Sequence, residues 1–121
     1  MEFIAYFVPT GILFLIIIGF GIWNSRVGKP YNGLLFNIHK LIALGAVILT
    51  GLRIWRMNPF GEFPSLVIIL LAVDVACVIT LFATGAIMSI KDQESRIVLA
   101  IHQLAPVLIT ISAVGILFLL I

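Results

Sequence analysis

The chain has 121 residues, of which 63% are hydrophobic and 10% are charged, and its mean hydropathy is +1.30. A soluble domain of this length cannot bury so much apolar surface, so the composition excludes a soluble enzyme and indicates a protein whose solvent is lipid. The net charge of +2 comes without a basic cluster interleaved with aromatic residues, so we expect no nucleic-acid partner. The single cysteine, Cys77, excludes a disulfide framework.

Four apolar segments follow one another along the chain, each long enough to cross a hydrocarbon core at roughly 20 residues per span. In chain order they cover residues 3–23, 33–56, 65–90 and 95–120. Each is predicted to be a helix, because an open segment in lipid must satisfy its own backbone hydrogen bonds. The linkers between them are short, and short linkers make neighbouring helices antiparallel. We therefore expect one all-α transmembrane domain over residues 1–121, folded as an up-down-up-down four-helix bundle.

The basic side chains are unevenly distributed between the two ends of these helices. Five lie on the side of the first and third linkers and two on the other, namely Arg26, Lys29, Lys40, Lys91 and Arg96 against Arg53 and Arg56. Lysine and arginine are enriched on the cytoplasmic side of membrane proteins. The sequence thus predicts a multi-pass protein of a bacterial or archaeal cytoplasmic membrane, with both termini outside.

Two histidines stand at matching places in the second and fourth segments, each within the pattern Ile-His-x-Leu. They are His39 and His102, each about six or seven residues into its segment and roughly 10 Å below the cytoplasmic end. Ionisable side chains inside a bilayer are costly and mark function by default, and neutral imidazole is a common ligand of haem iron. Two equivalent hairpins related by an axis along the membrane normal would bring the histidines opposite each other. We expect one haem b between them, with both histidines as iron ligands.

Other residues at this level fit the same site. Ala43 shares the helix face of His39, and Gly19 and Gly85 lie at similar depth, where small side chains would admit a porphyrin edge. Lys40 and Arg96 are candidates to pair with the haem propionates. Each residue also has an ordinary explanation, since small residues pack membrane helices and basic residues set the orientation.

The chain resembles the b-type cytochromes of energy-coupling membranes, in which a four-helix bundle holds haem between histidines on different helices. The resemblance rests on the helix count, the short linkers and the motifs Ile38-His39-Lys40-Leu41 and Ile101-His102-Gln103-Leu104. It implies electron transfer with a quinol or with a separate redox subunit. Cytochromes of the b561 type carry histidines for two haems, whereas this chain has two histidines in all. The resemblance therefore implies one haem, with electron transfer at the cytoplasmic face.

Other functions remain open on the sequence. The histidines could simply form hydrogen bonds between helices in a small transporter or assembly subunit, with Asp74 and Arg53 as the important pair. Asp74 could also belong to a proton path or to a quinone headgroup site. A haem carrier or sensor is a third reading, and a homodimer formed through lipid-facing helix surfaces is possible.

Overall fold

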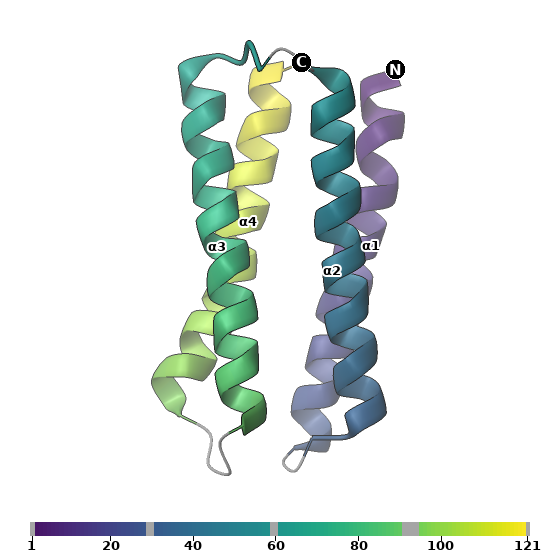
Figure 1. Ribbon diagram of the computed structural model, residues 1–121, viewed down its shortest axis with the longest axis vertical. Coiled ribbons are helices and arrows are strands. Elements are labelled where there is room, and N and C mark those ends of the chain that lie inside the picture. The colour runs from purple at the N-terminus through teal and green to yellow at the C-terminus, as the bar shows by residue number, and fades with distance from the viewer. Residues whose placement is uncertain (1, 29–30, 59–60, 91–94, 121) are drawn as a thin grey trace. The chain divides into compact units, whose positions relative to one another are not determined.

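The computed structural model describes residues 2–28, 31–58, 61–90 and 95–120, without the side chains of residues 2, 3 and 6 (Figure 1). The described residues form four helices, α1 (Glu2–Val27), α2 (Gly33–Met57), α3 (Ser65–Ile90) and α4 (Arg96–Leu120). Each helix is long and apolar enough to cross a membrane. The prediction of an all-α membrane protein with four spanning helices is confirmed.

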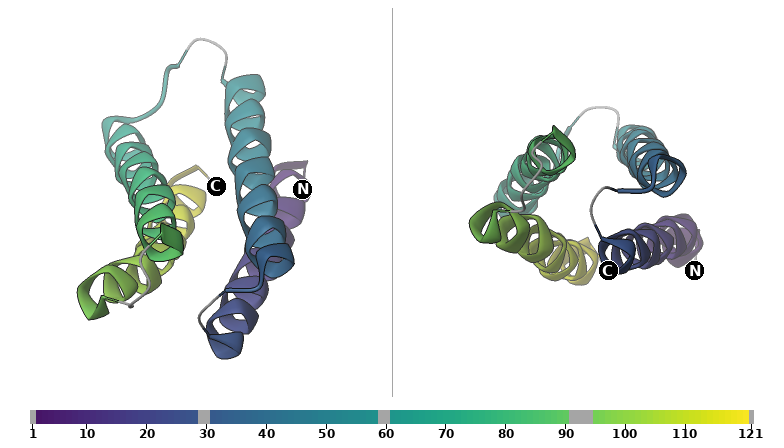
Figure 2. Two further views of the ribbon diagram at one scale, coloured as in Figure 1. Left: turned by 60° about the horizontal axis from the view of Figure 1, so that its bottom comes forward. Right: turned by 90° about the horizontal axis from the view of Figure 1, so that it is seen from below.

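The chain divides into two helical hairpins, residues 1–61 and residues 62–121. In the first hairpin α1 packs against α2, and in the second α3 packs against α4. The two helices of each hairpin run antiparallel (Figures 1 and 2). This agrees with the direction that the short first and third linkers predict.

Helix α1 extends four residues beyond the predicted end at residue 23. The prediction ended the helix where the apolar run gives way to polar residues, but a helix can continue past the hydrocarbon core. Gly28 ends it, with a φ of 77° that an L side chain rarely adopts, and its N–H donates to the Asn24 carbonyl at 3.3 Å. Asn24, expected in the linker, therefore belongs to the last turn of α1.

Helix α2 begins at Gly33 because Asn32 caps its first turn. The Asn32 side-chain oxygen accepts from the backbone N–H groups of Leu34 at 2.9 Å and of Leu35 at 3.3 Å. This cap sets the start of the helix and so places His39 six residues into it. His102 lies six residues after Arg96, the first residue of α4.

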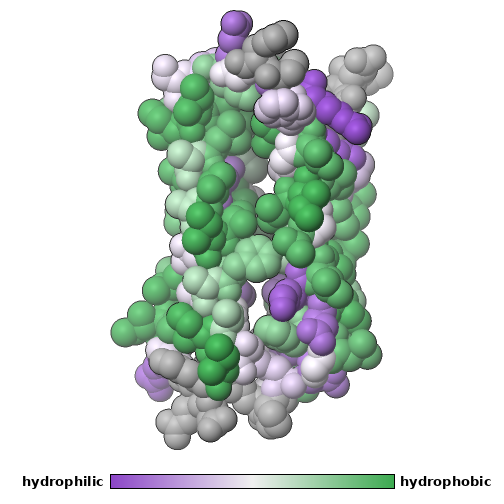
Figure 3. All heavy atoms as spheres, in the orientation of Figure 1, coloured by the Kyte–Doolittle hydropathy of each residue, from purple (hydrophilic) through white to green (hydrophobic). Residues whose placement is uncertain are grey.

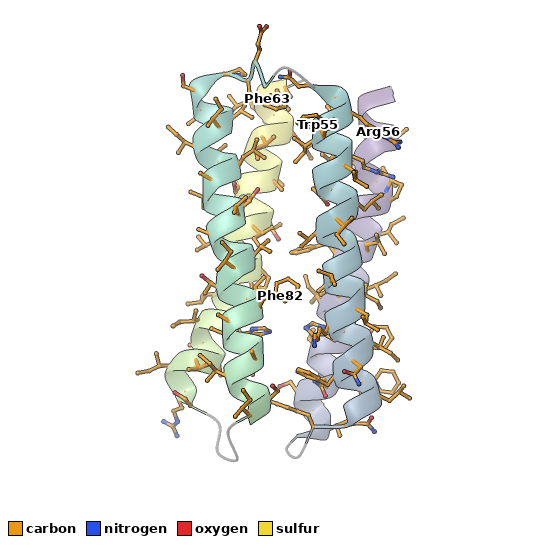
Figure 4. The ribbon with its side chains drawn as sticks, viewed as in Figure 1. Trp55, Arg56, Phe63 and Phe82 are labelled. Carbon is orange, nitrogen blue, oxygen red and sulfur yellow. The ribbon has the colours of Figure 1, made fainter. Side chains whose placement is uncertain are left out.

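The helices expose most of their large apolar side chains, as expected for surfaces that face lipid. Leu15 is 68% exposed, Ile79 is 64% exposed and Phe118 is 83% exposed. Apolar atoms cover the length of the helices, and hydrophilic atoms gather mainly towards their ends (Figure 3). Near the end of α2, Trp55 and Arg56 are both exposed and point to different sides of the helix, and both residue types are typical of a membrane interface (Figure 4).

Three of the five basic residues assigned to the cytoplasmic side are described, and all three are exposed. Arg26 lies at the end of α1, Lys40 in the first turns of α2, and Arg96 at the start of α4. Lys29 and Lys91 lie outside the described residues.

Candidate functional site

The imidazole of His39 lies against α1 in the first hairpin. Its Nδ1 atom is 3.0 Å from the backbone carbonyl oxygen of Ile17. A carbonyl oxygen can only accept, so the contact is a hydrogen bond when Nδ1 carries the proton and donates it. In the neutral ring the lone pair then lies on Nε2. In that tautomer Nε2 is the ring nitrogen with ligand chemistry.

Gly21 provides the space for this ring. A Cβ atom at position 21 would lie 3.0 Å from Cε1 of His39, tighter than nine in ten contacts of real Cβ atoms, and 3.8 Å from Nε2. Any larger residue would push the imidazole away from α1. The close approach of ring and helix backbone thus requires glycine here.

The sequence pointed to Gly19, whereas the structure places Gly21 against His39. A Cβ atom at Gly19 would meet nothing within 4 Å, and the residue is exposed. Two residues correspond to about 200° of rotation around a helix, so Gly19 and Gly21 face nearly opposite directions. The role of Gly19 beside a porphyrin stays a prediction, and Gly21 is the neighbour of the histidine.

The imidazole of His102 is held in the second hairpin by a threonine of α3. Nδ1 of His102 lies 2.8 Å from Oγ1 of Thr84, whose side chain is buried. The single hydroxyl proton of Thr84 is directed to backbone carbonyls of its own helix, at 2.7 Å to Thr80 and 3.2 Å to Leu81. With that proton used there, the hydroxyl oxygen can accept from Nδ1–H of His102, and in this tautomer the lone pair of the neutral ring lies on Nε2.

Gly85 lies beside His102, as Gly21 lies beside His39. A Cβ atom at Gly85 would come 3.4 Å from Cε1 of His102, a tight but ordinary contact. Each hairpin thus carries a histidine six residues into its second helix, next to a glycine of its first helix. The hairpins share one local design, in which Nδ1 is bound to an acceptor and the ring lies on a glycine.

The remaining predicted site residues lie near the start of the helices that carry the histidines. Ala43 is one turn beyond His39 on α2 and is half-buried, and Ala46, on the same face, is buried. Lys40 and Arg96 are exposed. Both are therefore accessible to an anionic group at the membrane interface.

Asn24 is a further polar residue on the histidine side of α1. Its side chain is 7% exposed, and its Oδ1 atom is buried without a hydrogen-bond partner among the described residues. It stands three residues after Gly21 and thus on the same side of the helix. Neither this residue nor Gly21 was singled out from the sequence, because the rotation of α1 against α2 cannot be read from composition.

Asp74 and Arg53 each interact within their own hairpin. Asp74 is half-buried beside the hydroxyl of Ser112, and its Oδ1 atom has no hydrogen-bond partner among the described residues. Ser112 also donates to the carbonyl of Leu70 at 3.1 Å. Nη1 of Arg53 lies 3.5 Å from Oγ1 of Thr10. These contacts join α3 to α4 and α1 to α2, and the pairing of Asp74 with Arg53 stays a prediction.

Two neutral imidazoles are a better ligand set for haem iron than for a bare metal ion. Within the described ranges, no group of three or more histidine, cysteine, aspartate or glutamate side chains gathers to hold a metal. The porphyrin supplies four of the iron ligands, so the protein supplies only the axial nitrogens. The donor set therefore fits haem.

No protein-family model matches the chain, and no curated protein or solved structure matches it either.

Proposed function

We propose that the protein is a small b-type membrane cytochrome, in which Nε2 of His39 and Nε2 of His102 are the two axial ligands of one haem b. The observation that supports this is the common state of the two rings. In each hairpin Nδ1–H is bound to an acceptor, Ile17 or Thr84, so that the lone pair lies on Nε2. Histidines that ligate metals almost always donate their other N–H in this way, which sets the tautomer and the ring direction.

Neighbouring residues have defined parts in this proposal. Gly21 and Gly85 let the imidazoles lie close to the first helix of each hairpin. Ala43 is a half-buried small residue on the His39 face of α2, where it can admit a porphyrin edge, whereas Gly19 faces away from the His39 ring. Lys40 and Arg96 are exposed cations at the starts of α2 and α4, where they can pair with haem propionates.

The bound haem would supply a one-electron iron couple close to one face of the membrane. The larger number of basic residues at this end of the helices favours a cytoplasmic location for that face, with both termini outside. With one haem near one face, the chain by itself would not carry electrons across the whole bilayer. Its electron partner is a quinol or a separate redox subunit, and the exposed apolar helix faces permit a homodimer in the lipid.

The same hydrogen bonds support a second candidate function. Each histidine joins the two helices of its hairpin, and an interhelical hydrogen bond of this kind stabilises membrane proteins without any cofactor. In that case the protein is a small transporter or assembly subunit, with Asp74 and Arg53 as its functional groups. A haem carrier or sensor would share the ligands of the cytochrome and differ in releasing haem readily.

Visible spectroscopy of the detergent-purified protein tests the proposal. The air-oxidised and dithionite-reduced spectra are recorded for the wild type and for the variants His39→Ala and His102→Ala. The cytochrome proposal predicts a sharp α band on reduction of the wild type and its loss from both variants, while all three proteins insert into membranes. A colourless wild type that cannot be reconstituted with haemin would favour the cofactor-free function. Rapid loss of haem to an acceptor protein would favour the carrier.

A further inference from the structure

Asn24 is a buried amide with an unused hydrogen-bonding atom, in the last turn of α1. Its exposure is 7%, whereas Trp23 is 56% exposed and the following residues Ser25 and Arg26 are also exposed. The amide therefore points inward from the helix rather than towards lipid or water. Leaving a buried polar atom unpaired is unfavourable, so such a group marks a place where another molecule can complete the bonding.

The position of Asn24 relates it to His39. Ile17, Gly21 and Asn24 follow one another at helical spacing and share one face of α1. The carbonyl of Ile17 and the Cα position of Gly21 both contact the His39 ring. Asn24 is three residues further along, about 4.5 Å along the helix axis towards the cytoplasmic end. It thus lies between the histidine and the membrane surface.

The chemistry of the amide defines what it can bind. Rotation of the amide by 180° exchanges Oδ1 and Nδ2, so the buried atom can be an acceptor or a two-proton donor. Haem carries two propionate carboxylates on one edge, and an edge of this kind has to lie towards the polar end of the site. Among the described residues at this level, the cations Arg26 and Lys40 are exposed, whereas the Asn24 amide is buried and donates from Nδ2 after that rotation. We infer that the Asn24 side chain donates a hydrogen bond to a propionate of the haem ligated by His39. This inference rests on the proposed function.

The rate of haem loss to excess apomyoglobin tests the inference, together with the midpoint potential. Both are measured for wild type, Asn24→Leu and Asn24→Asp, each loaded with haem or with haem dimethyl ester, in which the propionates are blocked. Asn37→Leu is the matched control, because Asn37 is an exposed asparagine two residues before His39.

The expected results follow from the charge of the propionate. Asn24→Leu should lose haem several-fold faster than wild type, and Asn24→Asp faster still with a lower potential, because two carboxylates then face each other. The dimethyl ester should remove most of the difference between Asn24→Asp and wild type, and Asn37→Leu should match wild type throughout. The wild type should also release the ester faster than haem, a comparison that needs no substitution.

Other outcomes would overturn the inference. Equal rates and potentials for wild type, Asn24→Leu and Asn24→Asp, with the low-spin spectrum intact, would refute the propionate contact and leave the cytochrome proposal standing. Unchanged haem retention with a raised KM for quinol would assign Asn24 to a quinone headgroup instead. A wild-type protein that binds no haem would refute both proposals together.

Discussion

Replacing Gly21 with alanine tests the histidine–glycine contact most sharply, because the structure gives the size of the clash. The added Cβ atom would lie 3.0 Å from Cε1 of His39, so the ring must retreat by about 0.4 Å to reach the ordinary contact of 3.4 Å found at Gly85. If the ring retreats along the Nδ1–O line, the 3.0 Å contact between Nδ1 and the Ile17 carbonyl lengthens to at most roughly 3.4 Å, near the limit of a hydrogen bond.

The energetic terms have opposite signs. Overpacking costs about 1–3 kcal/mol, and loss of the hydrogen bond costs about 1 kcal/mol. Alanine in place of a helical glycine stabilises the helix by about 1 kcal/mol, which offsets part of this loss. We therefore expect Gly21→Ala to destabilise the protein by about 1–3 kcal/mol. The contact at Gly85 can be accommodated, and Gly19 has open space, so alanine at either position should be neutral or stabilising by up to about 1 kcal/mol.

The assay is equilibrium unfolding in mixed detergent micelles with increasing sodium dodecyl sulfate, followed by helix content. Gly21→Ala should unfold at a lower denaturant fraction than wild type, and Gly19→Ala and Gly85→Ala at an equal or higher one. The haem content of Gly21→Ala should fall as well, because its His39 ring no longer has a set direction. Equal unfolding curves for Gly21→Ala and Gly19→Ala would refute the contact between His39 and α1.

Three further substitutions separate the site from the rest of the protein. Thr84→Val removes the acceptor of His102 Nδ1–H, so it should lower the free energy of unfolding by about 1–3 kcal/mol and speed haem loss several-fold, whereas Thr84→Ser should behave as wild type. Haem-loss rates of Thr84→Val equal to wild type would contradict the role of the hydroxyl. Ser112→Ala removes the hydrogen bond to the Leu70 carbonyl and should lower the stability in micelles by about 1 kcal/mol, while the visible spectrum stays unchanged. A shifted spectrum would show that this contact acts on the haem site. Asp74→Asn should lower thermal stability and leave the rate of haem reduction by quinol unaltered. A slower reduction with an intact spectrum would instead support a proton path.

The helices were predictable because a membrane span needs a long apolar run, and this chain has four. The error at the end of α1 has a simple cause. Hydropathy reports where the hydrocarbon core ends, whereas Gly28, with its positive φ, decides where the helix ends. Asn24 was assigned to a linker for that reason, and its burial against the hairpin interior was missed.

The histidines could be identified from the sequence alone, but their immediate partners could not. His39 and His102 are polar residues in apolar helices, which is visible without a structure. Gly21 and Thr84 acquire their roles from the rotation of one helix against another, and several residues at each depth compete for that position. Gly85 and Gly19 were both chosen on depth alone; the structure places Gly85 beside His102, whereas Gly19 has nothing within 4 Å of an added Cβ atom.

The claim that His39 and His102 ligate the same iron is tested most directly by electron paramagnetic resonance of the ferric protein, with the haem-to-protein ratio measured on each sample. The wild type is compared with His39→Gly and His102→Gly, each with and without added imidazole. Shared ligation predicts one haem per chain with a low-spin signal in the wild type, and a high-spin signal or haem loss in each variant. The low-spin signal should return when imidazole replaces the missing side chain. A low-spin signal that persists in either variant without imidazole, or a wild type without haem, would contradict shared ligation.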